Sequence, residues 1–115
     1  MATLLIFAPL SQAVPTILVF GDSLSAGYGL RQDAAWPVLL GKRLQDMQYH
    51  YTVVNASISG ETSRGGVTRI EPLLLKHQPQ VVIVALGAND GLRGLPVDAL
   101  RDNLTTIIRS AQQRK

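Results

Sequence analysis

The sequence predicts an α/β fold in which a parallel sheet is covered by helices on both faces. Two apolar runs, residues 15–21 and 80–86, do not alternate with polar residues, which is typical of strands buried on both faces. Segments with apolar residues at helical spacing separate the predicted strands. The resulting order β-α-β-α-β-α indicates right-handed crossovers between strands that pair in parallel.

The first half of the chain contains two predicted strands and one helix. Residues 15–21 form the first strand, and residues 51–55 form the second. Between them we expect a helix over residues 34–47, with Asp33 as its N-cap and Pro37 tolerated in its first turn. The apolar residues of this helix recur at helical spacing: Trp36, Leu39, Leu40, Leu44 and Met47.

The second half continues the alternation. Thr62 or Ser63 caps a helix that runs to about His77, although Pro72 leaves a kink or a later start near Ile70 open. Its inner face is predicted to hold Val67, Ile70 and Leu74. The third strand covers residues 80–86, and a loop over residues 87–96 leads to a last helix that begins near Pro96 or Val97. The apolar stripe of that helix comprises Val97, Leu100, Leu104, Ile107, Ile108 and Ala111.

Composition indicates a globular protein and excludes several function classes. The chain has 115 residues, of which 46% are hydrophobic and 17% charged, so we expect one domain or part of one. The net charge of +3 comes from scattered Lys and Arg, without the basic stripe of a nucleic-acid-binding protein. The absence of cysteine rules out disulfides, cysteine-based zinc sites and a thiol nucleophile.

The amino terminus has the pattern of a secretory signal peptide. An apolar core, residues 2–10, is followed by Ser11-Gln12-Ala13, which resembles a small-x-small cleavage site. We therefore expect a signal peptide over residues 1–13, a mature portion over residues 14–115, and a periplasmic or secreted protein. No Lys or Arg precedes this apolar core, so two alternatives remain: a wrongly assigned start codon, or an apolar tail packed on the domain. The segment is too short to span a membrane.

Each predicted strand ends in a loop of small and polar residues. These loops hold Ser23, Gly60 and Asn89, and the carboxyl ends of parallel strands lie at the same edge of a sheet. A serine oxygen can attack a carbonyl carbon, while a glycine N–H and an asparagine amide can donate to the oxyanion that develops. The trio therefore suits acyl transfer.

Structural roles are the alternatives for the same residues. A serine after a strand is commonly a helix N-cap, a glycine can serve a plain turn, and an asparagine can form an Asx-turn. We expect the neighbouring carboxylates of Asp22 and Asp90 to organise their loops rather than to take part in chemistry.

The combined motifs resemble those of a known family. Gly21-Asp22-Ser23-Leu24-Ser25, then Gly60, then Gly87-Ala88-Asn89-Asp90 are similar to the first three blocks of the GDSL, or SGNH, hydrolases. The opening is most similar to a periplasmic group of arylesterases, acyl-CoA thioesterases and lysophospholipases. The resemblance implies a flavodoxin-like three-layer α/β/α sandwich, no cofactor, and hydrolysis of small acyl esters or thioesters. It also implies Ser23 as nucleophile, with an oxyanion hole formed by the Ser23 and Gly60 N–H groups and the Asn89 amide.

The general base that the resemblance implies is missing. No Asp-x-x-His block is present, and the histidines, His50 and His77, immediately precede the second and third strands. They should therefore lie at the edge opposite Ser23, and a strand of ~5 residues at ~3.3 Å each separates the two edges. We expect the third strand to leave an exposed apolar edge. The chain accordingly reads as a domain truncated after its third βα unit, poorly soluble and nearly inactive alone.

Two further interpretations remain open. The hydroxyls of Ser23 and Ser25 at a helix start would suit a flavodoxin-like module that binds an anion or a flavin phosphate. The sequence there matches neither the GxGxxG nor the P-loop fingerprint. The other interpretation is a non-catalytic remnant of the hydrolase family, for which the missing histidine block is the argument.

Overall fold

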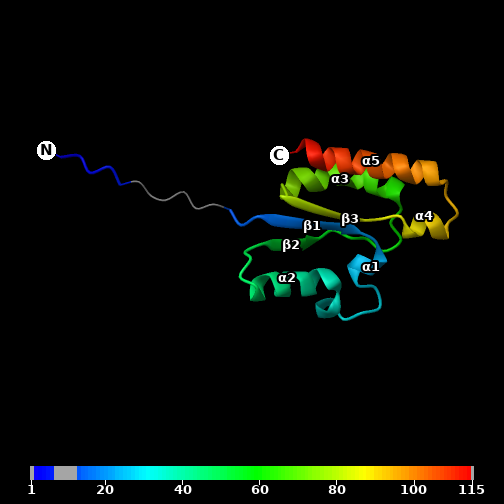
Figure 1. Ribbon diagram of the computed structural model, residues 1–115, viewed down its shortest axis with the longest axis horizontal. Coiled ribbons are helices and arrows are strands. Elements are labelled where there is room, and N and C mark those ends of the chain that lie inside the picture. Colours follow the sequence, from blue (N-terminus) through cyan, green and yellow to red (C-terminus); the bar gives the residue numbers. More distant parts are fainter. Residues whose placement is uncertain (1, 7–12, 115) are drawn as a thin grey trace.

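The computed structural model, which describes residues 2–6 and 13–114, has a parallel three-stranded sheet at its centre. Helices α3 and α5 cover one face of the sheet and α2 covers the other (Figure 1), so the predicted three-layer α/β/α arrangement is confirmed. The elements are β1 (Thr16–Gly21), α1 (Ser23–Ala26), η1 (Gln32–Ala34), α2 (Trp36–Asp46), β2 (Thr52–Asn55), α3 (Ser63–His77), β3 (Val81–Ala85), α4 (Ala88–Leu92) and α5 (Val97–Gln113).

Strand β1 lies in the middle of the sheet, whose order is β2-β1-β3. Its side chains Leu18, Val19 and Phe20 are fully buried, as the continuous apolar run predicts. Phe20 packs with Ile70 of α3 and Ile107 of α5 in the core on that face of the sheet. The central strand is thus the best-buried element, and it carries the first candidate loop at its end.

The strand register brings the three candidate loops to one edge. Val19 of β1 pairs with Asn55 of β2, and Gly21 pairs with Ala85 of β3. Because all pairings are parallel, the segments that follow Gly21, Asn55 and Ala85 all leave the sheet at its carboxyl edge.

Helix α3 follows its predicted bounds. Thr62 is its N-cap and accepts a hydrogen bond from the Gly65 N–H over 3.3 Å. Ile70 and Leu74 are buried on its inner face. The helix begins at Ser63 and continues through Pro72, so the alternative of a late start near Ile70 is wrong.

Two local predictions, the cap at Asp33 and the loop over residues 87–96, are wrong. Asp33 is not an N-cap, because it lies within η1 and its carboxylate pairs with Arg31 over 2.6 Å, and α2 begins without a side-chain cap. The predicted loop 87–96 contains the short helix α4. The apolar stripe of α5 is only partly buried, since Ile107 is fully buried whereas Val97 and Ile108 are 69% and 45% exposed.

The outer edge of the sheet is apolar. Strand β3 consists of Val81-Val82-Ile83-Val84-Ala85, and in the described part of the chain it pairs on one side only, with β1. Val81 is 42% exposed, and the rest of the strand is half-buried. The exposed apolar edge that the sequence predicts is therefore present.

The signal-peptide prediction lies largely outside the described residues, because residues 1 and 7–12 are not among them. Residues 2–6 and 13–15 form no helix or strand. No helix in residues 2–6 and 13–114 is long and apolar enough to cross a membrane.

Candidate active site

Ser23 opens the single-turn helix α1 directly after the central strand. The carboxylate of Asp22 caps this turn by accepting a hydrogen bond from the Leu24 N–H over 3.0 Å, as expected for a loop-organising residue. Ser23 is half-buried, whereas Asp22 is buried. Because Asp22 occupies the Leu24 N–H, that donor is not open to a phosphate, which weakens the anion-binding alternative.

Ser25 attaches the turn that carries Ser23 to neighbouring elements through hydrogen bonds. The buried Ser25 hydroxyl accepts a hydrogen bond from the Trp36 indole N–H over 3.1 Å. The Ser25 carbonyl accepts another from the Asn55 side-chain amide over 2.8 Å. These contacts attach α1, the turn that carries Ser23, to both α2 and the end of β2.

The loop after β2 is attached to the strand end that precedes Ser23. The Gly21 N–H donates to the Ser57 hydroxyl over 3.1 Å, and the Ile58 N–H donates to the Gly21 carbonyl over 3.1 Å. Further along this loop, Gly60 has φ +82°, a left-handed conformation that favours glycine. Within the described residues, no acceptor is found for the N–H groups of Ser23 and Gly60.

The loop after β3 is attached to the loop after β2. Asn89 is half-buried and donates from its side-chain amide to the Glu61 carbonyl over 2.9 Å. Arg93 donates to the Gly60 carbonyl over 3.2 Å. All three loops that carry the predicted site residues are therefore joined through hydrogen bonds at one edge of the sheet (Figure 1).

Asp90 is a buried support for the third loop. It accepts hydrogen bonds from the Ser63 N–H over 2.8 Å and from the Ser63 hydroxyl over 2.6 Å. Asn103 of α5 donates to the same hydroxyl over 3.0 Å. This network fixes α4 to α3 and α5, which agrees with the expected organising role of Asp90.

A hollow of about 470 Å³ lies beside the Ser23 turn. It is lined by Asp22, Leu24, Ser25, Trp36, Ala85, Leu86 and Ala88, most of which present apolar surface. An apolar hollow next to a serine-bearing turn can accept the hydrocarbon part of a ligand.

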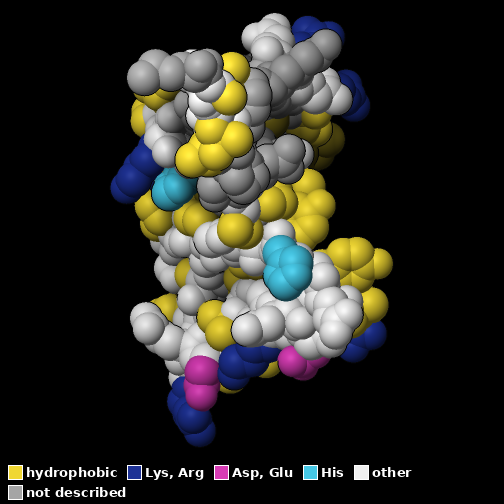
Figure 2. Space-filling model, turned by 90° about the vertical axis from the view of Figure 1, so that its left-hand side faces the viewer, with side chains coloured by type: hydrophobic (Ala, Val, Ile, Leu, Met, Phe, Trp, Pro, Cys, Tyr) yellow, Lys and Arg dark blue, Asp and Glu magenta, His cyan; other side chains and the backbone are white. Residues whose placement is uncertain are grey.

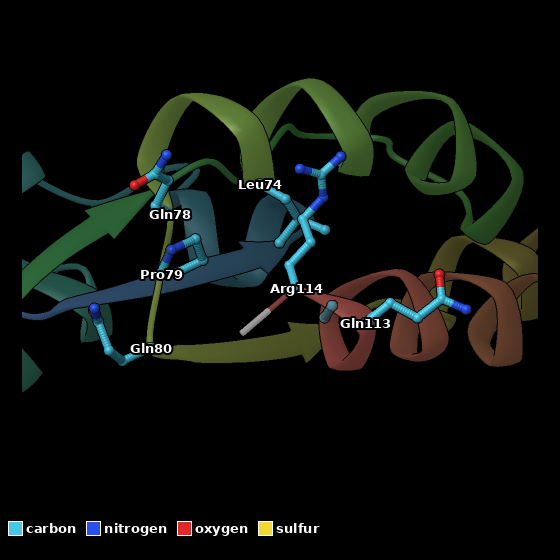
Figure 3. Close-up of a pocket in the computed structure, with 7 residues that line it drawn as sticks. Leu74, Gln78, Pro79, Gln80, Gln113 and Arg114 are labelled. Atoms are coloured by element: carbon cyan, nitrogen blue, oxygen red, sulfur yellow. The ribbon is translucent and has the colours of Figure 1, made fainter.

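A larger hollow of about 640 Å³ lies away from these loops. Figure 3 shows it between the end of α3, the segment that leads into β3, and the end of α5. Its lining includes Gln78, Gln80 and Arg114, but no serine or histidine. Arg114 is already paired with Glu71. This hollow therefore offers no nucleophile for acyl transfer.

Both histidines lie away from Ser23, as the sequence predicts. His50 precedes β2 and is exposed, while His77 is the half-buried last residue of α3, just before β3. Figure 2 shows histidine side chains on the face at the amino ends of the strands. Ser23 follows the carboxyl end of β1. The length of the sheet thus separates both imidazoles from the candidate nucleophile.

Two residues next to the candidate site, Glu61 and Arg69, were not among the predicted site residues. Glu61 accepts the Asn89 amide through its carbonyl and pairs through its carboxylate with Arg69 of α3. The signal available in the sequence was the charge of Arg69, which lies next to the apolar stripe of an amphipathic helix and immediately before the buried Ile70. A charged side chain at such a position needs a polar partner to offset its burial.

Comparisons with known proteins agree with this arrangement. Residues 19–115 match the GDSL-like Lipase/Acylhydrolase family. Esterase TesA of Pseudomonas aeruginosa is 49% identical over 100 residues, which cover 87% of this chain and 50% of that protein. Thioesterase 1/protease 1/lysophospholipase L1 of Escherichia coli is 47% identical, with 87% of this chain and 47% of that protein covered.

A solved structure shares the fold. The psychrotrophic esterase EstA from Pseudoalteromonas sp., in a structure inhibited by monoethylphosphonate, matches with a TM-score of 0.82 and 46% identity. The match covers 86% of this chain and 54% of that one. This chain spans about half the length of the curated relatives it matches. The matched region includes all three candidate loops, and the chain belongs to the GDSL-like lipase/acylhydrolase family.

Proposed function

We propose that this chain carries the nucleophile and the oxyanion hole of a serine hydrolase that acts on acyl esters or thioesters. The observation that carries the proposal is the position of Ser23. It lies on a capped turn at the end of the buried central strand, the loop of Gly60 is hydrogen-bonded to that strand end, and the loop of Asn89 is hydrogen-bonded to the loop of Gly60.

The proposed reaction proceeds through an acyl-enzyme. The Ser23 oxygen attacks the acyl carbonyl carbon while a base takes the hydroxyl proton, and a tetrahedral intermediate forms. Its collapse expels the alcohol or thiol, which takes up a proton, and leaves the acyl group on Ser23. Water then attacks the same carbonyl carbon and releases the acid.

The proposed oxyanion hole has three donors. The N–H groups of Ser23 and Gly60 have no acceptor among the described residues. The Asn89 amide carries two hydrogens, of which one is donated to Glu61 and the other remains for the substrate oxygen. Fixed donors aimed at a developing negative charge are a large source of rate enhancement.

The substrate class follows from the relatives and the adjacent hollow. The relatives are named as an esterase and as a thioesterase/lysophospholipase. The hollow beside Ser23 is mostly apolar and suits an acyl chain or an aryl group. We therefore expect arylesters, acyl thioesters or lysophospholipids as substrates.

The base is proposed to come from polypeptide outside residues 1–115. Both histidines of this chain are at the far edge of the sheet, out of reach of Ser23. The other half of the relatives' length has no counterpart here. We accordingly expect the 115-residue chain by itself to turn over esters very slowly.

Export is part of the proposal. The apolar segment 2–10 and the Ser11-Gln12-Ala13 site support cleavage after Ala13 and a periplasmic or secreted location. Amino-terminal sequencing of protein from the natural host is expected to begin at Val14. A protein that begins at Met1 would contradict this.

The test of the proposed function compares two serine variants in protein isolated from the natural host together with the polypeptide that is proposed to supply the base. Hydrolysis of neutral aryl esters and acyl thioesters is measured for Ser23→Ala and for Ser59→Ala, an exposed serine beside Gly60. Ser23→Ala is expected to reduce turnover by about 10⁴-fold or more, because the nucleophile is lost. Ser59→Ala is expected to retain it. Turnover that survives Ser23→Ala would overturn the proposal.

A further inference from the structure

Arg69 of α3 holds the loop after β2 at both of its ends. Its Nη1 pairs with the Glu61 carboxylate over 2.5 Å, and its Nη2 donates to the Ala56 carbonyl over 2.8 Å. Ala56 and Glu61 bracket the segment that contains Gly60. A planar guanidinium can bind two acceptors at once, which the ammonium of lysine does less well.

The Arg69–Glu61 pair is sheltered from water. The two side chains are only 26% and 10% exposed, so salt screens their attraction less than it screens a surface pair. The guanidinium carbon also lies 5.4 Å from the centroid of the buried Phe20 ring, a cation–π distance. The side chain of Arg69 is therefore fixed by the core of the domain as well as by the loop.

Glu61 joins the two donors that come from outside the Ser23 turn. It directly follows Gly60 in the chain, and its carbonyl accepts the Asn89 side-chain amide over 2.9 Å. Any movement of Glu61 thus moves the Gly60 N–H and the Asn89 amide together. Arg69 controls that movement through the carboxylate of the same residue.

Gly65 leaves the space in which the Glu61 carboxylate lies. A Cβ atom at position 65 would overlap Glu61 Oε1 and stand 3.1 Å from Glu61 Cδ. The first turn of α3 is therefore built to receive this carboxylate.

We propose that Arg69 is a positioning residue that sets the distance between the Gly60 N–H and the Asn89 amide through Glu61. The proposal rests on the proposed function, because it assigns Arg69 to the oxyanion hole of that reaction. Arg69 itself touches neither the substrate nor Ser23 in this assignment. Its loss should loosen the loop and misplace two donors without removing either of them.

The first experiment measures hydrogen–deuterium exchange by mass spectrometry on the whole chain. Arg69→Gln is compared with Lys76→Gln, which removes the same charge from an exposed position on the same helix. In Arg69→Gln we expect exchange at the Ile58 and Glu61 amides to be about 10- to 100-fold faster, because charge-assisted hydrogen bonds are lost. Peptides from α2, on the other face of the sheet, should be unaffected. Unchanged loop exchange, or equal acceleration throughout the chain, would overturn the proposal.

A second variant guards against a general loss of stability. Gly65→Ala adds a side chain that displaces the Glu61 carboxylate, while alanine favours the helix more than glycine does. We expect the same faster exchange at Ile58 and Glu61 with a smaller fall in the thermal unfolding temperature than in Arg69→Gln, because the helix preference of alanine offsets part of the lost ion pair. A loop that stays protected in Gly65→Ala would count against control through the Glu61 carboxylate.

Kinetic measurements distinguish a positioning role of Arg69 from a purely structural one. In the hydrolysis assay described above, Arg69→Gln is expected to lower kcat about 100-fold with little change in KM, since small displacements of catalytic groups cost that much. Arg69→Lys should recover only part of it, because one ammonium replaces a two-armed contact. A rise in KM at constant kcat would contradict the proposal. If Ser23→Ala retained turnover, the proposed function would fail, whereas the exchange result on Arg69 would stand independently.

Discussion

The side-chain amide of Asn89 donates a hydrogen bond to the backbone carbonyl of Glu61 over 2.9 Å. These residues are 28 positions apart in the chain, and they follow the two outer strands of the sheet. Strand β1, which leads into Ser23, lies between these two strands. The contact therefore joins the loops that follow the strands on either side of the one that precedes the candidate nucleophile.

Replacing Asn89 should impair catalysis more than stability. Asn89→Ala removes the contact to Glu61 and the proposed oxyanion donor, so we expect kcat to fall by about 10²–10³. Asn89→Asp should be at least as impaired, because a carboxylate cannot donate and would face the Glu61 carbonyl. Ester hydrolysis and thermal unfolding are measured on the same preparations. A variant with near wild-type kcat would exclude Asn89 from the oxyanion hole.

Gly60→Ala should destabilise the chain through its backbone. With φ at +82°, an alanine at this position is strained by about 1–2 kcal/mol. Urea unfolding is expected to show a loss of that size. Gly91→Ala is the matched control, since its added Cβ meets nothing within 4 Å and its φ is not positive. Equal stability of the two variants would contradict the strained conformation of Gly60.

Asp90→Ala should be among the more damaging single changes. It leaves the buried Ser63 N–H and hydroxyl without their acceptors, at a cost of about 1–3 kcal/mol each. We expect the free energy of unfolding to fall by about 2–5 kcal/mol in urea titrations. Asp98→Ala, which removes an exposed carboxylate paired with Arg101, should change it little. A mild effect of Asp90→Ala would mean that the network is not stabilising.

The Glu71–Arg114 pair makes a pH-dependent contribution. Hydrogen bonds from Arg114 and then Ser110 hold the pKa of Glu71 below its usual value of 4.5. A depressed folded-state pKa stabilises the fold above the unfolded-state pKa, and this contribution is lost as the pH falls through the folded-state value. An NMR titration of the Glu71 carboxyl should show the lowered pKa, and Arg114→Gln should raise it. An unchanged pKa in Arg114→Gln would contradict this cause.

The apolar edge of β3 should make the 115-residue chain associate with itself. Val81 is 42% exposed on a strand without charged residues, and unpaired edges of this kind recruit further strands. Light scattering across a concentration series should show species larger than a monomer, and Val81→Lys should reduce them. Val97→Lys changes an exposed valine away from the edge and should not. A monomer at every concentration would contradict the prediction.

The sequence predicted the structure correctly where apolar residues run without interruption along the chain or a cap lies in its own turn. The apolar runs of β1 and β3 place both strands to within about one residue, because neither run is interrupted by a polar residue, although only β1 is buried and β3 is a half-buried edge strand. The cap at Thr62 was also predictable, since its hydroxyl reaches a backbone N–H in its own turn. Because each loop follows a strand, the order of the chain then predicted that all three loops lie at the carboxyl edge of the sheet.

Features that depend on distant partners, or on a choice between two local hydrogen bonds, were not predictable. Helix α4 is a single turn that depends on the buried contact between Asp90 and Ser63. The Asp33 carboxylate pairs with Arg31 instead of capping α2, a competition between two local hydrogen bonds. The role of Arg69 becomes visible only when α3 is packed against the loop it holds.

The most direct measurement is the intact mass of the protein from its natural source, before and after exposure to a fluorophosphonate. A relative with this fold is inhibited by a phosphonate, so a serine nucleophile should be trapped in the same way. The account predicts one adduct per chain, located at Ser23 by peptide mapping and absent from Ser23→Ala. A protein that gains no adduct, or that gains one equally in Ser23→Ala, would contradict the assignment and favour a non-catalytic remnant.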